Sequence, residues 1–414
     1  MFNILFLLFV SFMAIYINVW FLLMSPDVKA RMGEKRKAKR TPAISILIPA
    51  HNEATTVAKT LKSLLGLDYP KDKLEVIVIE NGSTDNTLNV VRRFVKSVSG
   101  LKIRVLSMPE SGKAKALNLG LKHAKGELIG VLDADTFVTR TCLKRMVGYF
   151  DDSCVGAVTN HVKIVKPHRL IPSLQDIEYI FSAFSKKLIS LLDALYVVPG
   201  TLSLMRRDLV NKVGFSQDTL TEDMDVAICI LKENYKIVNA LDAVSYTDVP
   251  KSLKGLLKQR IRWYRGFMQN FRKHSDVIFN RKFPHLGYFV LPFASLLAIF
   301  IGSFLTLVLI FDIIRSVTLF VKGVAYIPIL EKLSLDLGAL SITNFIISPY
   351  STISYAIILI ETFIILVISF RALKVESKKK FIFLPIYFFM YYCLIMVFWI
   401  ISAFMELLGR RKRW

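Results

Sequence analysis

The chain has 414 residues, of which 53% are hydrophobic, and its formal net charge is +23. Its four cysteines, Cys142, Cys154, Cys229 and Cys393, lie far apart and form no CxxC pair. This argues against a zinc knuckle or a disulfide framework and fits a reducing compartment. The positive charge suggests nucleic acid as a partner, but membrane proteins also gather Lys and Arg on their cytoplasmic side.

The N-terminal residues 1–25 predict a transmembrane helix. Residues 2–24 contain no charged side chain, and about 20 such residues are enough to cross a hydrocarbon core of about 30 Å. Positive charges follow this run, in residues 29–40, which favours an uncleaved anchor over a signal peptide. We therefore expect a basic juxtamembrane linker over residues 26–42 and a cytoplasmic domain after it.

Residues 43–284 alternate between patterns of strand length and patterns of helix length. Residues 43–50 and 73–80 are apolar runs rich in Ile and Val, as in parallel strands that are buried on both faces. Helical spacing lies between them, with Asn52 as the predicted N-cap. The alternation continues and predicts an α/β domain with a mainly parallel sheet, which binds ligands beyond the carboxyl ends of its strands.

Long apolar runs return in the C-terminal region, residues 285–414. We predict transmembrane spans at residues 285–311, 353–370 and 383–407. Residues 325–349 are apolar but include charged side chains, so they predict an interfacial or re-entrant segment. Basic clusters flank the last span on both sides, so the positive-inside rule does not determine the topology of this region.

Two carboxylates end an apolar strand pattern in the run GVLDADT. Asp133 and Asp135 are two residues apart, so their side chains point the same way on extended chain. Such a pair can hold a hard divalent cation, with ligand phosphates filling its other positions. Asp-x-Asp alone is common, and the alternative is a polar loop.

Three further polar stretches follow the predicted strands. The runs IPAHNE and IENGSTDNT leave buried strands for turns that open onto the same edge of the sheet, although each is by itself an ordinary turn signal. The run GKAKALN brings Lys113 before a helix, where its charge would offset that of a metal-bound diphosphate. Taken alone, this third run predicts an exposed basic helix.

An acidic cluster and a basic aromatic cluster stand later in the chain. Glu222, Asp223 and Asp225 fall within four positions, which suggests a metal, a proton transfer or a charged ligand rather than a solvated helix face. The run KQRIRWYRG surrounds Trp263 with arginines. It fits stacking on single-stranded nucleic acid, binding of sugar and phosphate, or an amphipathic helix at a membrane surface.

The order of these motifs resembles that of the family 2 glycosyltransferases of the GT-A fold. The motifs are HNE, ENGSTD, GKAKALN, DAD, TED and QRIRW, followed by apolar runs. The resemblance is strongest to the processive, membrane-embedded branch that includes cellulose, chitin, hyaluronan and poly-N-acetylglucosamine synthases. It covers residues 43 to about 270, and Q-x-x-R-W after TED is its most specific element. It implies a GT-A α/β domain in the cytoplasm joined to α-helical segments in the plasma membrane.

The resemblance also implies a reaction and a role for each matching residue. A sugar would move from a nucleotide sugar, usually a UDP-sugar, to an acceptor hydroxyl with inversion. Asp223 would be the general base, Asp135 the ligand of Mg²⁺ or Mn²⁺, and Arg262 a counter-charge to the leaving diphosphate. Residues implied for the nucleotide sugar are Pro49, His51, Glu53, Glu80, Asn81, Lys113, Asp133, Asp135 and Arg262. Residues implied for the acceptor are Gly200, Thr201, Glu222, Gln259 and Trp263.

The chain departs from the family at two positions. His51 stands where Tyr is frequent, and Asn81 stands where Asp is frequent, so the contact with the nucleotide is expected to differ. TED and VPG are closer to the cellulose and poly-N-acetylglucosamine synthases than to hyaluronan synthases, which favours UDP-N-acetylglucosamine as donor. Linkage, accessory subunits and homo-oligomers are left open by the sequence.

Several alternatives stand beside a processive synthase that passes its glycan through the membrane. One is a single transfer to a lipid acceptor, such as a polyprenyl phosphate or a glycolipid. An inactive scaffold is disfavoured because every expected catalytic position is filled. A basic nucleic-acid-binding membrane protein is disfavoured because no recognised module is present, so we expect membrane lipid, and not nucleic acid, as a partner.

Overall fold

The computed structural model of the chain covers most of the predicted cytoplasmic domain and part of the C-terminal region. The predicted N-terminal helix, residues 1–25, and the predicted segment 325–349 lie outside the described residues. Much of the predicted spans 285–311 and 353–370 does so too. The described residues are 30, 34, 36–165, 167–297, 314, 317, 318, 360, 363–375 and 378–409.

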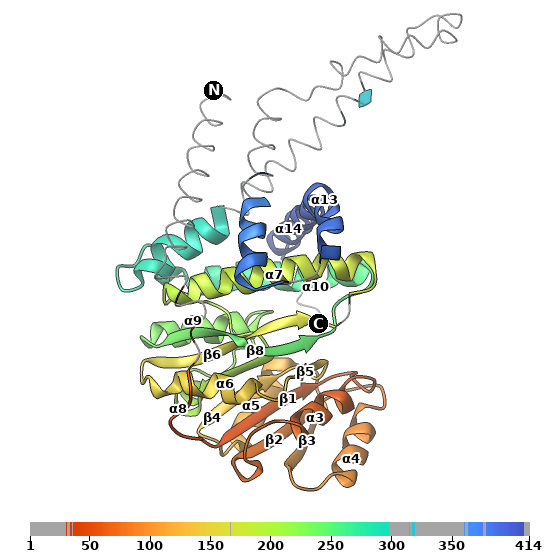
Figure 1. Cartoon of the computed structure of the whole chain (residues 1–414), viewed down its shortest axis with the longest axis vertical. Coiled ribbons are helices and arrows are strands. Elements are labelled where there is room, and N and C mark those ends of the chain that lie inside the picture. Colours follow the sequence, from red (N-terminus) through yellow and green to blue (C-terminus); the bar gives the residue numbers. More distant parts are fainter. Residues whose placement is uncertain are drawn as a thin grey trace, which may run out of the picture.

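A sheet of eight strands, counted over the described residues, forms the centre of the domain in the order β3-β2-β1-β4-β7-β6-β8-β5 (Figure 1). β1 pairs in parallel with β2 and β4, and β2 pairs in parallel with β3. β7 runs antiparallel to both β4 and β6, and β5 runs antiparallel to β8. The strands are β1 (Ile44–Ala50), β2 (Leu74–Asn81), β3 (Lys102–Met108), β4 (Leu128–Leu132), β5 (Thr136–Val138), β6 (Val155–Ile164), β7 (Thr201–Arg206) and β8 (Lys236–Thr247).

The parallel sheet expected from the sequence is therefore found in the first half of the domain, whereas the second half is mixed. A run of buried apolar residues indicates a strand but carries no information on its direction. The stretch 197–208, which includes the predicted acceptor residues Gly200 and Thr201, contains β7 and the start of a helix after it.

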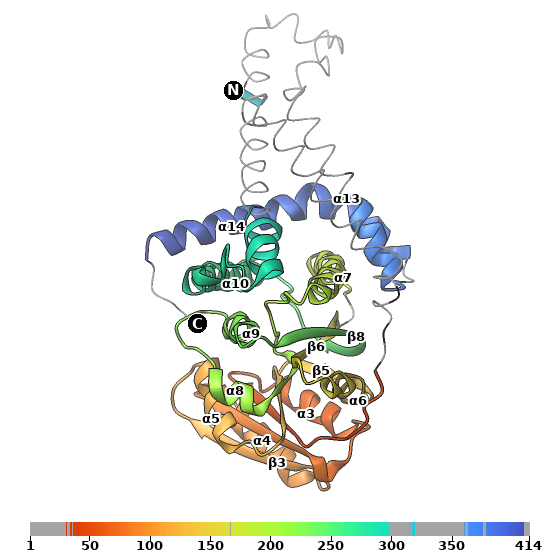
Figure 2. The same ribbon diagram turned by 90° about the vertical axis from the view of Figure 1, so that its left-hand side faces the viewer.

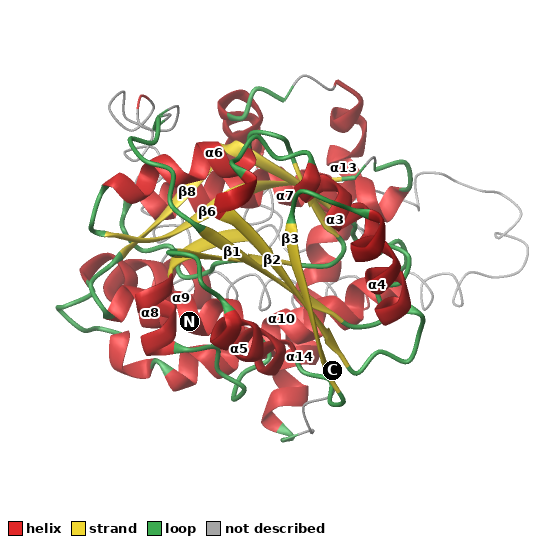
Figure 3. Cartoon of the chain, turned by 90° about the horizontal axis from the view of Figure 1, so that it is seen from below, coloured by secondary structure: helices red, strands yellow, loops and turns green. Residues whose placement is uncertain are grey.

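Helices cover both faces of the sheet (Figure 3). Ile46 of β1 shares a hydrophobic cluster with Leu61 of α3, whereas Leu47 lies in a second cluster with Leu117 of α5. Successive side chains of a strand point to opposite faces, so a strand that is covered on both faces reads as one continuous apolar run. The shorter helices are α3 (Val57–Leu65), α4 (Thr87–Ser97), α5 (Lys113–His123), α6 (Cys142–Val147), α8 (Arg207–Val213) and α9 (Glu222–Lys232).

Two long helices, α7 (Leu170–Leu191) and α10 (Leu253–Lys273), form a layer between the sheet and the C-terminal helices (Figures 1 and 2). The helices α13 (Leu384–Ile386) and α14 (Tyr392–Leu407) lie across this layer in Figure 2. The Trp399 ring of α14 stacks on the Tyr264 ring of α10, with 4.0 Å between the ring centroids. The predicted span 383–407 is thus in close contact with α10.

The described C-terminal helices do not by themselves test the predicted spans. Over the residues for which the structure gives a position, no helix is both long enough and apolar enough to cross a membrane. The transmembrane spans stay predictions.

One local prediction was wrong. Asn52 is not the N-cap of the first helix, because α3 begins at Val57 with Thr56 in the cap position. Asn52 instead has a positive φ of 57°, and its Oδ1 accepts a hydrogen bond of 2.8 Å from the backbone N–H of Thr84. Asn tolerates this left-handed conformation better than most residues. The hydrogen bond to Thr84 connects the turn after β1 to the turn after β2.

Candidate active site

Three neighbouring parallel strands end at the same edge of the sheet and carry three of the sequence motifs. β1 lies between β2 and β4, so His51, Asn81 and Asp133 follow adjacent strand ends. The Nδ1–H of His51 donates to the backbone carbonyl of Asn81 at 2.9 Å. The expectation that these turns open onto one edge is confirmed, because the carboxyl ends of parallel strands coincide.

Glu80 stabilises the turn after β2. Its carboxylate is buried and accepts 2.6 Å hydrogen bonds from the backbone N–H of Ser83 and from the hydroxyl of Ser107. Burial alone would raise the pKa of Glu80, but these hydrogen bonds lower it below its ordinary value. Pro49 and Asn81 are buried as well, so these three predicted nucleotide contacts shape the edge from within.

Lys113 links the motifs that come from different parts of the chain. Its Nζ lies 2.7 Å from Oδ1 of Asp133 and 3.1 Å from Oε1 of Glu222. Burial would lower the pKa of Lys113, but the carboxylates of Asp133, Glu222 and Asp223 together raise it. Lys113 is therefore a permanent positive charge at the centre of an acidic group, at the start of α5.

Asp135 lies close to two other carboxylates, whose negative charge is only partly balanced by nearby positive charge. Burial and the carboxylates of Asp133 and Glu53 raise the pKa of Asp135 to about 7. A carboxylate that is disfavoured in this way gains from a nearby divalent cation. Carboxylate oxygens are the donors that Mg²⁺ and Mn²⁺ prefer, so the residues present fit such an ion, with Asp135 and Asp133 as its protein ligands.

Asp223 lies in the first turn of α9 and faces the same group of charges. Its Oδ1 accepts a 2.9 Å hydrogen bond from the backbone N–H of Met224. Burial and the neighbouring Glu222 raise the pKa of Asp223 to about 6, against the opposing charges of Lys113 and Arg262. A half-buried carboxylate with a raised pKa, close to two cations, has the properties of a general base.

The loop before β7 joins the two acidic motifs. The backbone N–H of Asp133 donates to the carbonyl of Gly200 at 2.6 Å, and that of Val198 donates to the carbonyl of Asp223 at 3.2 Å. A Cβ atom added to Gly200 would lie 2.5 Å from the carboxylate of Asp133. Glycine is therefore required at position 200 for the loop to pass this close to the acid.

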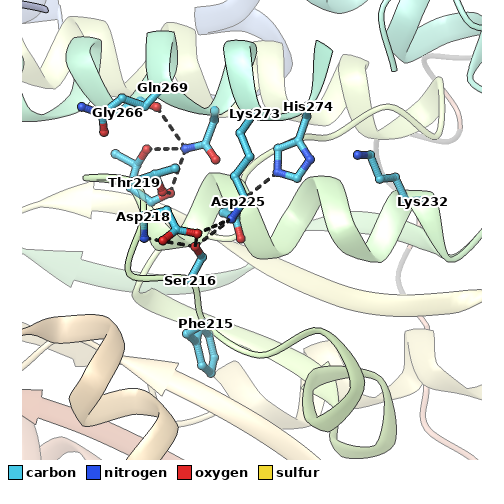
Figure 4. Close-up of polar contacts among 12 residues, drawn as sticks. Phe215, Ser216, Asp218, Thr219, Asp225, Lys232, Gly266, Gln269, Lys273 and His274 are labelled. Carbon is cyan, nitrogen blue, oxygen red and sulfur yellow. Dashed lines mark hydrogen bonds and ion pairs between the residues drawn. The ribbon is translucent and has the colours of Figure 1, made fainter. Parts of the chain in front are cut away.

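Hydrogen bonds to the end of α10 hold the start of α9 (Figure 4). The Nδ2 of Asn270 donates to Oγ1 of Thr221 at 2.9 Å. Nε2 of His274 and Nζ of Lys273 lie 2.9 Å and 2.8 Å from Oδ1 of Asp225. These contacts lower the pKa of Asp225 although burial opposes them. Asp225 is thus a structural acid in the first turn of α9.

Asp225, Cys229 and His274 are close enough together to share a metal ion. Two observations indicate instead that these contacts serve to hold α9 against the end of α10. Lys273 already pairs with the same Asp225 oxygen that His274 contacts, and burial raises the pKa of the Cys229 thiol to about 11. A protonated thiol is a poor metal ligand.

Two predicted acceptor residues have buried polar atoms without a partner among the described residues. These atoms are Oε1 of Gln259 on α10 and Oγ1 of Thr201 at the start of β7. Buried polar atoms are usually hydrogen-bonded, so an unpartnered one suggests a position that a ligand completes. Trp263 is partly buried against a hydrophobic cluster formed with α7 and the C-terminal helices.

Sequence reasoning missed α7, because residues 170–191 contain none of the motifs. Tyr179 and Lys186 are seven residues apart and therefore share a helical face. Burial raises the pKa of Tyr179 to about 12, and the charge of Arg260 opposes this rise. Burial lowers the pKa of Lys186, against the charge of Asp223. A tyrosine and a lysine on one face of a helix rich in apolar residues were the signal in the sequence.

Comparisons with known proteins agree with this arrangement. Residues 45–214 match the model of glycosyl transferase family 2. Probable glycosyltransferase YdaM of Bacillus subtilis is 30% identical over 279 residues, which are 64% of this chain and 66% of that protein. Poly-β-1,6-N-acetyl-D-glucosamine synthase of Staphylococcus epidermidis is 33% identical over 269 residues, 63% of this chain and 64% of that protein. The chain thus matches just under two thirds of the length of these curated relatives.

A solved structure is similar in fold to this chain. It is the mannosyltransferase PcManGT from Pyrobaculum calidifontis in complex with GDP-Man and Mn²⁺, with a TM-score of 0.60 and 22% sequence identity. The match covers 96% of this chain and 99% of that one. The α/β domain with its mixed sheet is GT-A-like. This chain contains a glycosyl transferase family 2 domain.

Proposed function

We propose that the chain is an inverting glycosyltransferase that moves a sugar from a nucleotide sugar, with a UDP-sugar favoured, to the hydroxyl of an acceptor glycan. One observation carries the proposal. Lys113 bridges Asp133, from the strand edge that would bind the nucleotide, to Glu222, the neighbour of Asp223. Asp133, which would bind the donor, and Asp223, which would activate the acceptor, thus both lie close to Lys113.

Asp223 would take the proton of the acceptor hydroxyl as that oxygen attacks the anomeric carbon. A pKa of about 6 leaves the carboxylate ionised at neutral pH and yet basic enough to accept a proton. Attack would come in line with the leaving nucleotide, so one displacement inverts the centre. A divalent ion held by Asp135 and Asp133 would supply positive charge for the diphosphate.

Lys113 and Arg262 would balance the negative charge that develops on the leaving group. Both are close enough to Asp223 to oppose the rise of its pKa, so both lie where donor and acceptor would meet. Fixed positive charges at a partly buried site stabilise developing charge more strongly than they would in water.

The acceptor would bind between the start of β7 and α10. The unpartnered atoms of Gln259 and Thr201 offer hydrogen-bond acceptors, and Trp263 offers an aromatic face for sugar C–H groups. The short distance between Gly200 and Asp133 limits the width of this site.

We favour UDP-N-acetylglucosamine as donor and processive synthesis of a β-linked glycan. The proposal is supported by the TED and Q-x-x-R-W motifs and by relatives that are named poly-β-1,6-N-acetyl-D-glucosamine synthases. The long apolar runs on both sides of the domain support a multi-pass protein of the plasma membrane with a cytoplasmic active site and the glycan leaving through the bilayer.

The test uses the purified full chain in nanodiscs with Mn²⁺ and a panel of radiolabelled UDP- and GDP-sugars. A ladder of products from one UDP-sugar, digestible by a β-specific glycosidase, is the expected result. A single product that partitions into organic solvent would replace the processive proposal with transfer to a lipid acceptor. Absence of nucleotide release from every donor would refute the glycosyltransferase proposal.

A further inference from the structure

The helix α10 carries a buried arginine to which the proposed chemistry assigns no role. Arg260 is 2% exposed, and its guanidinium carbon lies over the Trp263 ring, 4.4 Å from the ring centroid. The two residues are three positions apart on a helix and are therefore neighbours on one face. A cation at this distance from an indole ring is attracted to it.

Two other elements hold the guanidinium in this position. Nη2 of Arg260 donates to Oε2 of Glu178 on α7 at 2.7 Å, and the hydroxyl of Tyr391 donates to the same oxygen at 2.7 Å. The distance from Nη2 to the Tyr391 hydroxyl is 3.5 Å. A buried charge persists only where it is paired and hydrogen-bonded, and here the two hydrogen-bonding partners come from two separate segments.

An indole ring has two faces, and Arg260 covers one of them. We propose that Arg260 is a positioning residue for the acceptor, which fixes the Trp263 ring so that its opposite face receives the terminal sugar. Glu178 and Tyr391 hold Arg260 and thereby make α7 and the C-terminal segment part of the acceptor site. The acceptor part of this proposal rests on the proposed function.

A second buried arginine on the same helix provides a matched control. Nε of Arg265 lies 2.8 Å from Oε2 of Glu406, and the two side chains are 6% and 12% exposed. Arg265 is two positions from Trp263, and residues so spaced on a helix do not face each other. Replacing Arg265 therefore breaks a comparable ion pair but leaves the Arg260 guanidinium in contact with the Trp263 ring.

The first measurement follows the ring itself in the full-length protein without ligand. Tryptophan is replaced throughout by 5-fluorotryptophan, and the fluorine resonance of Trp263 is assigned with Trp263→Phe. We expect this resonance to shift and broaden in Arg260→Met, to change less in Arg260→Lys and Glu178→Gln, and to stay unchanged in Arg265→Met. An unchanged resonance in Arg260→Met would overturn the positioning role.

The second measurement compares the KM values for the two substrates, with UDP-N-acetylglucosamine as donor and a β-linked N-acetylglucosamine pentasaccharide as acceptor. Because a cation–π contact at a desolvated site contributes up to about 2 kcal/mol, we expect the acceptor KM of Arg260→Met to rise about fivefold to thirtyfold. The donor KM should stay within about twofold, and Arg260→Lys should recover part of the loss.

The two measurements test different parts of the proposal. An acceptor KM that rises equally in Arg260→Met and Arg265→Met would overturn the link between Arg260 and the acceptor, even where the fluorine resonance has moved. A wild-type protein that releases no nucleotide from any donor would refute the proposed function and the acceptor role with it. The fluorine spectrum would still decide whether Arg260 holds the ring.

Discussion

Replacing Asp223 with Asn should abolish transfer and at the same time stabilise the folded protein. Asn keeps the side-chain oxygen that accepts from the backbone N–H of Met224, but it cannot accept a proton. General-base catalysis contributes about 10²- to 10⁴-fold, so we expect a loss in kcat of that size. Binding of UDP should change little, because Asp223 lies on the acceptor side.

The gain in stability follows from the pKa. The pKa of Asp223 rises from its ordinary value of 3.8 to about 6 in the folded chain, a difference equivalent to roughly 3 kcal/mol. The folded state holds the proton of Asp223 more tightly than the unfolded state does. The resulting stabilisation of the fold is complete at pH below 3.8 and is lost as pH rises through about 6. At pH above 7 the half-buried carboxylate of Asp223 therefore costs about 1 to 3 kcal/mol of folding free energy, which Asn removes.

The assay is thermal unfolding in nanodiscs, followed by circular dichroism, together with initial rates of nucleotide release. Asp223→Asn should raise Tm when measured at pH above 7 and change it little in acid. The matched control is Asp225→Asn, two residues on, where Lys273 and His274 stabilise the carboxylate. This control should lower the free energy of unfolding at neutral pH by about 1 to 3 kcal/mol. A variant Asp223→Asn that keeps the kcat of the wild type, or that unfolds earlier than wild type at neutral pH, would refute the reasoning.

Three further predictions concern the rest of the site. The rate should fall as pH drops below about 6, where Asp223 takes up its proton, and a flat acid limb would contradict this. EDTA should stop transfer and Mn²⁺ or Mg²⁺ restore it, whereas full activity in chelator would remove Asp135 as a metal ligand. Gly200→Ala should reduce kcat/KM at least about tenfold, because its Cβ would lie 2.5 Å from the Asp133 carboxylate. Gly66→Ala, where the nearest atom is 3.6 Å away, should be active.

Much of the site could be predicted from the sequence because its parts lie at the ends of strongly patterned strands. Residues 43–50 and 73–80 are largely apolar runs rich in Ile and Val, and they form β1 and β2 within one residue of the expected bounds. In an α/β domain such strands are parallel neighbours, so the polar residues after them meet at one edge. The adjacency of DAD and of the turns after β1 and β2 followed from local pattern alone.

Other features depended on contacts between residues far apart in the chain. The apolar pattern of β7 does not encode that it runs antiparallel between β4 and β6. The anchor of Asp225 on His274 joins residues 49 positions apart, and the ion pair between Arg260 and Glu178 joins residues 82 positions apart. Periodicity records whether a side chain is buried but not what it is buried against. Only the tertiary structure therefore decided that Asp225 is an anchor, that Asp223 has a raised pKa, and that α7 reaches the ring of Trp263 through Arg260.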